Sequence, residues 1–164
     1  MTLKELLINE IQQESVSIRK MLSRVPTDKF GWKPHEKSMP LGHLASHIAT
    51  LFGWAEMVVT SDELDLKNFT PCEAKNGEEL LQLFENIKEK SVKALQQADE
   101  NALQNSEWTL RMGEHIIFKL TKYSIIRTMC FNHLYHHRGQ LSVYLRLLDI
   151  PVPGTYGPSA DEPN

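Results

Sequence analysis

Seven histidines occur in this chain of 164 residues, and their distribution is uneven. Five of them fall in two short segments, as His43, His47, His133, His136 and His137. In a helix, His133 and His137 would stack one turn apart on an apolar face, and His47 would likewise face the core. Buried imidazoles cost free energy unless their nitrogens are paired, and converging ones without nearby carboxylates are most simply satisfied by a metal ion. The sequence therefore predicts a metal site made by His47, His133 and His137.

Imidazole ligands distinguish poorly between divalent transition metals, so we expect one ion per chain, zinc or nickel. Six residues near the expected site are candidates for substrate binding, namely His43, Trp54, His136, Arg138, Gln140 and Tyr144. His43 is interpreted either as a hydrogen-bonded histidine at the edge of the core or as a fourth ligand or pocket residue. Arg138 could anchor an anion above the metal or make a structural salt bridge. No catalytic residue is assigned.

The apolar periodicity predicts the elements that must position these side chains. Helices are expected over residues 3–24, 40–60, 77–98 and from Thr121 to just before Pro151. Ser38, Asn76 with Glu79, and Thr121 are the expected N-caps. Between the third and fourth helices, TLRMGEHIIF is expected to form a short irregular hairpin or loop, and a Pro/Gly-rich tail follows the last helix. The prediction is an all-α four-helix bundle in a single domain, residues 1–164.

The composition excludes several classes of function. The formal net charge is −3 and no Lys/Arg-rich run occurs, which argues against a nucleic-acid partner. The N-terminal segment is charged and amphipathic, unlike a signal peptide or a membrane span, so we expect a cytoplasmic protein without a membrane partner. The two cysteines, Cys72 and Cys130, lack paired spacing and are expected to be reduced thiols.

Two stretches of the chain resemble the DinB/YfiT-like superfamily. They are GWKPHEKSMPLGHLASHIATLFGW at residues 31–54 and NHLYHHRGQLSVYLRLLDIPVPGTYGPSADE at residues 132–162. The resemblance implies a four-helix bundle that binds a divalent metal through His47, His133 and His137, with His136 as a neighbour. Two departures from the family pattern are Asp149, where a glycine commonly ends the helix, and His43, where an acidic residue is commoner.

The resemblance also implies a range of functions. Characterised relatives include thiol-dependent transferases and isomerases that use bacillithiol or mycothiol, and others are labelled metal-dependent hydrolases or stress-inducible proteins. A metal with three neutral histidines keeps its positive charge and can lower the pKa of a bound thiol or water. We therefore expect a metal-dependent transferase that joins a low-molecular-weight thiol to an electrophilic small molecule. A hydrolase and a non-catalytic metal-binding stress-response module are the alternatives, and the resemblance implies a homodimer.

Overall fold

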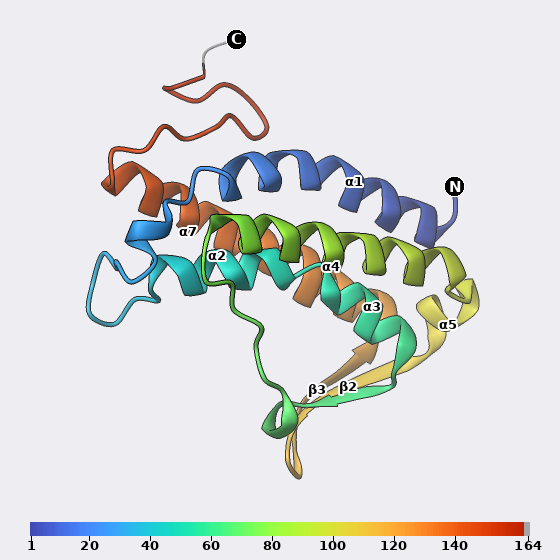
Figure 1. Ribbon diagram of the computed structural model, residues 1–164. Helices are drawn as coiled ribbons and strands as arrows, with labels where there is room; N and C mark the ends of the chain where they lie inside the picture. The colour runs from blue at the N-terminus through green and yellow to red at the C-terminus, as the bar shows by residue number, and fades with distance from the viewer. Residues whose placement is uncertain (163–164) are drawn as a thin grey trace.

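The computed structural model describes residues 1–162 and is mainly helical (Figure 1). Its α-helices are α1 (Leu3–Leu22), α2 (Leu41–Thr50), α3 (Gly53–Thr60), α4 (Gly77–Gln97), α5 (Glu100–Asn105), α6 (Lys122–Ile125) and α7 (His133–Leu147). The π-helical stretch η3 (Ile126–Asn132) joins α6 to α7, and two short 3₁₀ turns are η1 (Thr27–Lys29) and η2 (Leu66–Asn68). The long helices pack side by side around one apolar core, with α4 in contact with α1, α2 and α3.

Side-chain caps at two helix starts were readable from the sequence. Asn76 accepts a hydrogen bond from the Glu79 amide at 2.9 Å, and α4 begins at the next residue, as predicted. The Thr121 hydroxyl likewise accepts from the Ser124 amide at the start of α6. Each cap satisfies an amide that the helix itself leaves without a partner.

The expectation that Ser38 caps the second helix is wrong. Helix α2 begins at Leu41 after Pro40, and no side chain caps it. The amides of Leu41 and Gly42 instead donate to the carbonyls of Trp32 and Phe30, at 2.8 and 2.9 Å. This contact requires glycine at position 42, because a β-carbon there would lie 2.6 Å from the Phe30 ring. The preceding loop therefore fixes the start of the helix that carries His47.

The predicted single helix over residues 40–60 is interrupted. Helix α2 ends at Thr50 and α3 begins at Gly53. Across the junction the amides of Leu51, Trp54 and Ala55 bond to carbonyls three residues earlier, so the chain is wound more tightly there.

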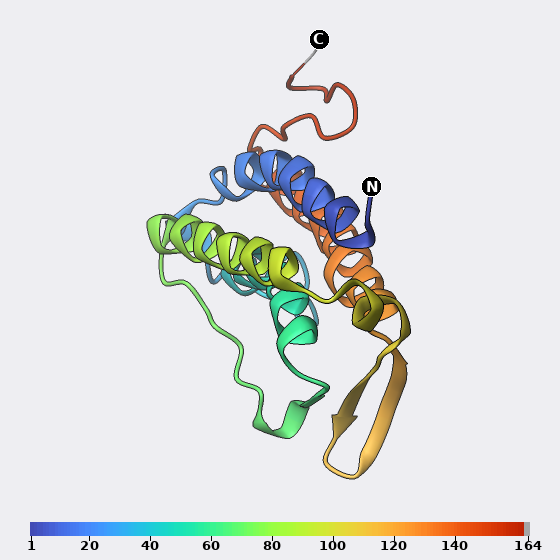
Figure 2. The same ribbon diagram turned by 90° about the vertical axis from the view of Figure 1, so that its right-hand side faces the viewer.

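The structure is mostly helical but not purely all-α, because the hairpin expected before the last helix is part of a small three-stranded sheet. Strand β1 (Glu63–Asp65) pairs in parallel with β2 (Glu107–Met112), which pairs antiparallel with β3 (His115–Thr121). The hairpin turns at Gly113, whose φ of 61° favours glycine. Asp65 accepts from the Gly113 amide and pairs with Arg111, which attaches β1 to the hairpin. The sheet lies on the side of the molecule away from the C-terminal tail (Figure 2).

The core consists of side chains contributed by all the long helices. Its largest fully buried members are Trp108, Phe52, Phe84 and Phe131. Within residues 1–162, none of the helices combines the length and apolar character that crossing a membrane requires.

The last helix ends in a left-handed turn at Asp149, which has a φ of 57°. The Ile150 amide bonds to the Leu145 carbonyl and the Asp149 amide to the Arg146 carbonyl, which is the hydrogen-bond pattern of a Schellman motif. Asp149 therefore holds the conformation for which glycine is normally selected, and the departure from the family pattern leaves the turn intact.

Replacing Asp149 tests this turn. We expect Asp149→Gly to raise the free energy of unfolding by about 0.5 kcal/mol, because glycine has no β-carbon to strain a left-handed residue. Asp149→Ala keeps the β-carbon, and alanine adopts the left-handed region less readily than aspartate, so it should lower stability. Urea unfolding of the two variants would measure the difference, and equal stabilities would contradict this account.

Candidate metal centre

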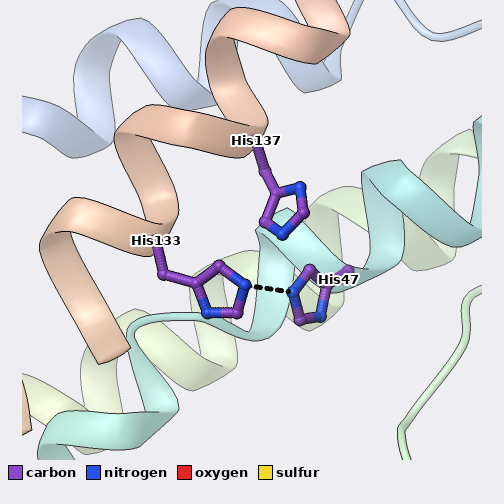
Figure 3. Close-up of side chains that lie close together, drawn as sticks. All are labelled: His47, His133 and His137. Carbon is purple, nitrogen blue, oxygen red and sulfur yellow. Dashed lines mark hydrogen bonds between the residues drawn. The ribbon is translucent and has the colours of Figure 1, made fainter. Parts of the chain in front are cut away.

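The three predicted ligands converge between two helices (Figure 3). His47 projects from α2, and His133 and His137 project from consecutive turns of α7. One ring nitrogen of each lies within 4.8 Å of the others, and the Nε2 atoms of His47 and His133 are 3.3 Å apart. The structure therefore brings together three residues that are up to 90 positions apart in the chain.

Burial and mutual repulsion keep these histidines neutral. Burial, followed by repulsion from His137, His133 and His43 in that order, lowers the pKa of His47 to about 4. Burial is also the main cause that lowers the pKa of His133 and that of His137. Near neutral pH the three imidazoles are therefore uncharged, which is the form that binds metal ions.

A hydrogen bond to Gln140 orients the ring of His137. The Nδ1 atom of His137 lies 2.7 Å from Oε1 of Gln140, so a proton on Nδ1 is donated to the amide oxygen and Nε2 is left as the ligand. Nδ1 of His133 is buried and has no hydrogen-bond partner among residues 1–162, while its Nε2 faces His47. Gln140 thus lies beside the site, where it contacts a ligand.

The donor set fits a divalent transition metal. Two nitrogens bound to one tetrahedral zinc ion, at about 2.0–2.1 Å each, lie about 3.3 Å from one another. The distance between His47 and His133 Nε2 atoms agrees with this spacing. Three neutral imidazoles suit zinc or nickel and do not suit calcium or magnesium, which prefer oxygen. Among residues 1–162, these histidines are a group that could hold a metal ion.

Two of the other candidates lie on one side of the site. His43 precedes His47 by one turn, and its Nδ1 atom lies 2.7 Å from Oε1 of Glu73. His43, His47 and Trp54 line the same cavity. His136 is exposed beside the His137 ring, with a centroid distance of 4.9 Å, and lies outside the three-histidine group.

Arg138 and Tyr144 are engaged elsewhere in the helical core. Arg138 is 5% exposed and pairs with Glu14 on α1, so its charge is compensated there. Of the two roles that the sequence allowed for Arg138, the structure therefore shows the salt bridge. The Tyr144 hydroxyl donates to the Met39 carbonyl at 3.2 Å, and its ring meets that of Trp32 edge-on.

Sequence reasoning missed Glu14 and Glu73. Glu14 lies between Ile11 and Ile18 on the apolar stripe of α1, and a carboxylate in that position is a detectable signal of a buried ion pair. Glu73 lies in an aperiodic segment, and nothing in its surroundings indicates a partner 30 residues away.

Comparison with known proteins places this geometry in a family. The model of the DinB family matches residues 1–164. This chain belongs to the DinB family. Among curated proteins, the uncharacterized YjoA of Bacillus subtilis (strain 168) is 28% identical over 130 residues, covering 77% of this chain and 78% of that protein. The uncharacterized YrdA of the same organism is 25% identical over 149 residues, covering 91% and 85%.

Solved structures of DinB-like proteins share the fold. The crystal structure of YjoA from Bacillus subtilis aligns with a TM-score of 0.69 at 23% identity, covering 88% of this chain and 92% of that one. A DinB-like protein from Bacillus cereus ATCC 10987 aligns with a TM-score of 0.71 at 21% identity, covering 93% and 97%. The DinB fold therefore extends over nearly the whole chain, including the helices that carry the histidines.

Single substitutions test which histidines bind the metal. We expect the protein to bind about one zinc ion, and His47→Ala, His133→Ala or His137→Ala to weaken binding by more than about 100-fold, beyond the effect typical of residues that only orient a ligand. His136→Ala is the matched control and should change the affinity little, because this side chain is exposed and outside the group. Competition with a chromogenic chelator measures the affinities. If His136→Ala lost as much metal affinity as His137→Ala, the assignment of the three ligands would be wrong.

The lowered pKa of His47 predicts how the metal-free protein responds to acid. Unfolded chains take up a proton on this imidazole near pH 6.5, but the folded protein does so only near pH 4. Stability is therefore lost as the pH falls from about 6.5 toward 4, because protons then favour the unfolded chain. With metal removed by a chelator, the melting temperature should fall between pH 7.5 and 5.0, and less so in His47→Gln. The exposed His115→Gln control should show the full decrease, and equal decreases in both variants would refute the assignment.

Proposed function

We propose that this DinB-family protein binds one zinc or nickel ion through His47, His133 and His137. We further propose that it transfers a low-molecular-weight thiol to an electrophilic small molecule. The observation that most supports this proposal is the convergence of three neutral imidazoles, of which His47 and His133 have the Nε2 spacing that one tetrahedral ion requires. Three protein ligands are the number found in catalytic zinc sites, whereas structural zinc sites have four.

The bound cation would supply positive charge that lowers the pKa of a thiol or of water, so that a nucleophile exists at neutral pH. Of the protein's two thiols, that of Cys130 is poorly suited to replace an external one. Cys130 is fully buried, and burial raises the pKa of its thiol. A buried thiol of this kind is inert.

The pair of His43 and Glu73 is suited to accept the proton that the nucleophile loses. Because the Glu73 carboxylate can only accept, the 2.7 Å contact with Nδ1 places the imidazole proton on that nitrogen. Nε2 of His43 then carries a lone pair and can take up the thiol proton. In the transfer, the sulfur forms a bond to the electrophilic carbon, the leaving group departs with its bonding electrons, and the thiol proton passes to Nε2.

A metal-dependent hydrolase is the second candidate. The same histidines and the same proton acceptor would serve water as the nucleophile in place of a thiol. A non-catalytic metal-binding module of a stress response is the third. We also propose a homodimer, which the exposed apolar side chains of Val143 and Leu147 on α7 support.

Activity measurements separate these functions. Zinc-loaded or nickel-loaded protein should accelerate the reaction of 1-chloro-2,4-dinitrobenzene with bacillithiol, mycothiol or cysteine, as followed by absorbance of the thioether. The His133→Ala variant should lose the acceleration, because the metal is no longer held. Hydrolysis of aryl esters without any thiol would favour the hydrolase instead. If the metal-loaded protein accelerates neither reaction, the catalytic proposal is wrong.

A further inference from the structure

A cavity of about 470 Å³ adjoins the three histidines on one side, and it lies within the usual size range of small-molecule sites. Helices α2, α3 and α4 and the segment at residues 69–73 form its walls. His47 lines one part of it, so a molecule in the cavity would reach a proposed metal ligand. Most of the remaining wall is apolar, from Leu51, Trp54, Met57, Phe69, Pro71 and Ile87.

The charged groups on the cavity wall are mostly acidic. Glu56 and Glu73 line it, and no lysine or arginine does so among residues 1–162. Glu73 is paired with His43, but the Glu56 carboxylate makes neither an ion pair nor a hydrogen bond with the described residues. An anionic ligand would therefore meet an uncompensated negative charge in a partly apolar site, where repulsion is stronger than in water.

We propose that this cavity binds the body of an apolar small molecule that is neutral or positively charged, and that it rejects anions through Glu56. Burial of the ligand's apolar surface against Trp54, Met57 and Ile87 supplies the binding free energy. The selection against anions is a property of this wall and does not require the metal. As an account of the substrate, the inference rests on the proposed function, because the cavity would present the electrophile beside His47.

The carboxylate at Glu56 also narrows the role of the cavity in catalysis. The body of a thiol that carries carboxylates of its own would be disfavoured there, so the cavity suits the electrophile. The substrate class is therefore an apolar electrophile without negative charge.

Two dyes that share one scaffold test this selection on the metal-free protein. N-phenyl-1-naphthylamine is neutral, and 1-anilinonaphthalene-8-sulfonate is the same molecule with one sulfonate added. Fluorescence titration should show binding of the neutral dye at micromolar concentration, and the anionic dye should bind at least about tenfold more weakly. Equal affinities, or tighter binding of the anion, would overturn the proposal.

A charge-neutralising variant identifies the group responsible. Glu56→Gln keeps the shape of the side chain, so the affinity for the neutral dye should not change. The affinity for the anionic dye should rise at least about threefold, which narrows the difference between the two dyes. Glu114→Gln, at the exposed tip of the hairpin, is the matched control and should leave the selectivity at its original value. If both variants behave alike, Glu56 does not select the ligand.

Cys72 reports whether the dye is in this cavity. Its exposed side chain lines the cavity, whereas Cys130 is buried and its raised pKa makes it unreactive. Saturating neutral dye should slow the alkylation of Cys72 by iodoacetamide at least about threefold, as measured by mass spectrometry. Binding without any protection would place the dye elsewhere and refute the assignment of the cavity.

The same titrations separate this inference from the proposed function. Selective dye binding by a protein that catalyses no thiol transfer would support the cavity and reject the transferase. Thiol transfer by a protein that binds neither dye, or that prefers the anion, would support the transferase and reject the cavity as the electrophile site.

Discussion

Three neutral imidazoles share one small volume between α2 and α7, and this contact constrains how the two helices can be placed. The Nε2 atoms of His47 and His133 lie 3.3 Å apart, and burial lowers the pKa of His47 to about 4. Without a shared ligand, buried nitrogens at such distances are poorly satisfied. A small rotation of either helix would separate the donors. The rest of the structure must therefore hold α2 and α7 in a defined orientation.

Helix α7 is oriented by polar contacts on the side that faces α1. Arg138, which follows His137 directly, is buried against Glu14, and it also bonds to Ser17 at 3.0 Å and to the Tyr156 hydroxyl at 2.6 Å. A buried ion pair adds little net stability, but breaking it is costly because one charge is left uncompensated. Rotating α7 away from this arrangement would break the pair. The pair with Glu14 thus stabilises the rotation at which His133 and His137 face α2.

Helix α2 is positioned by the loop before it and by the break after it. The close contact between Gly42 and Phe30 docks its first turn, and the tight turn at Leu51 and Phe52 redirects the chain into α3. As a consequence, His47 from α2 and Trp54 from α3 line one cavity. A single unbroken helix would have continued along the axis of α2. The break therefore joins the face that carries His47 to an apolar cavity.

The sequence by itself determined the features that depend on local periodicity and local hydrogen bonds. It predicted the helical segments but not the break after Thr50, and it predicted the caps at Asn76 and Thr121, the hairpin around Gly113 and the three histidines that converge. These predictions succeed because helical spacing and capping involve residues only a few positions apart.

Only the tertiary structure decided the remaining features. Strand β1 forms because a partner more than 40 residues away pairs with it, and Glu73 meets His43 across 30 residues. The start of α2 at Leu41 depends on carbonyls of a folded loop. Each of these contacts joins positions that are distant in the chain, and local pattern carries no information about which distant partner will satisfy a backbone or side-chain group.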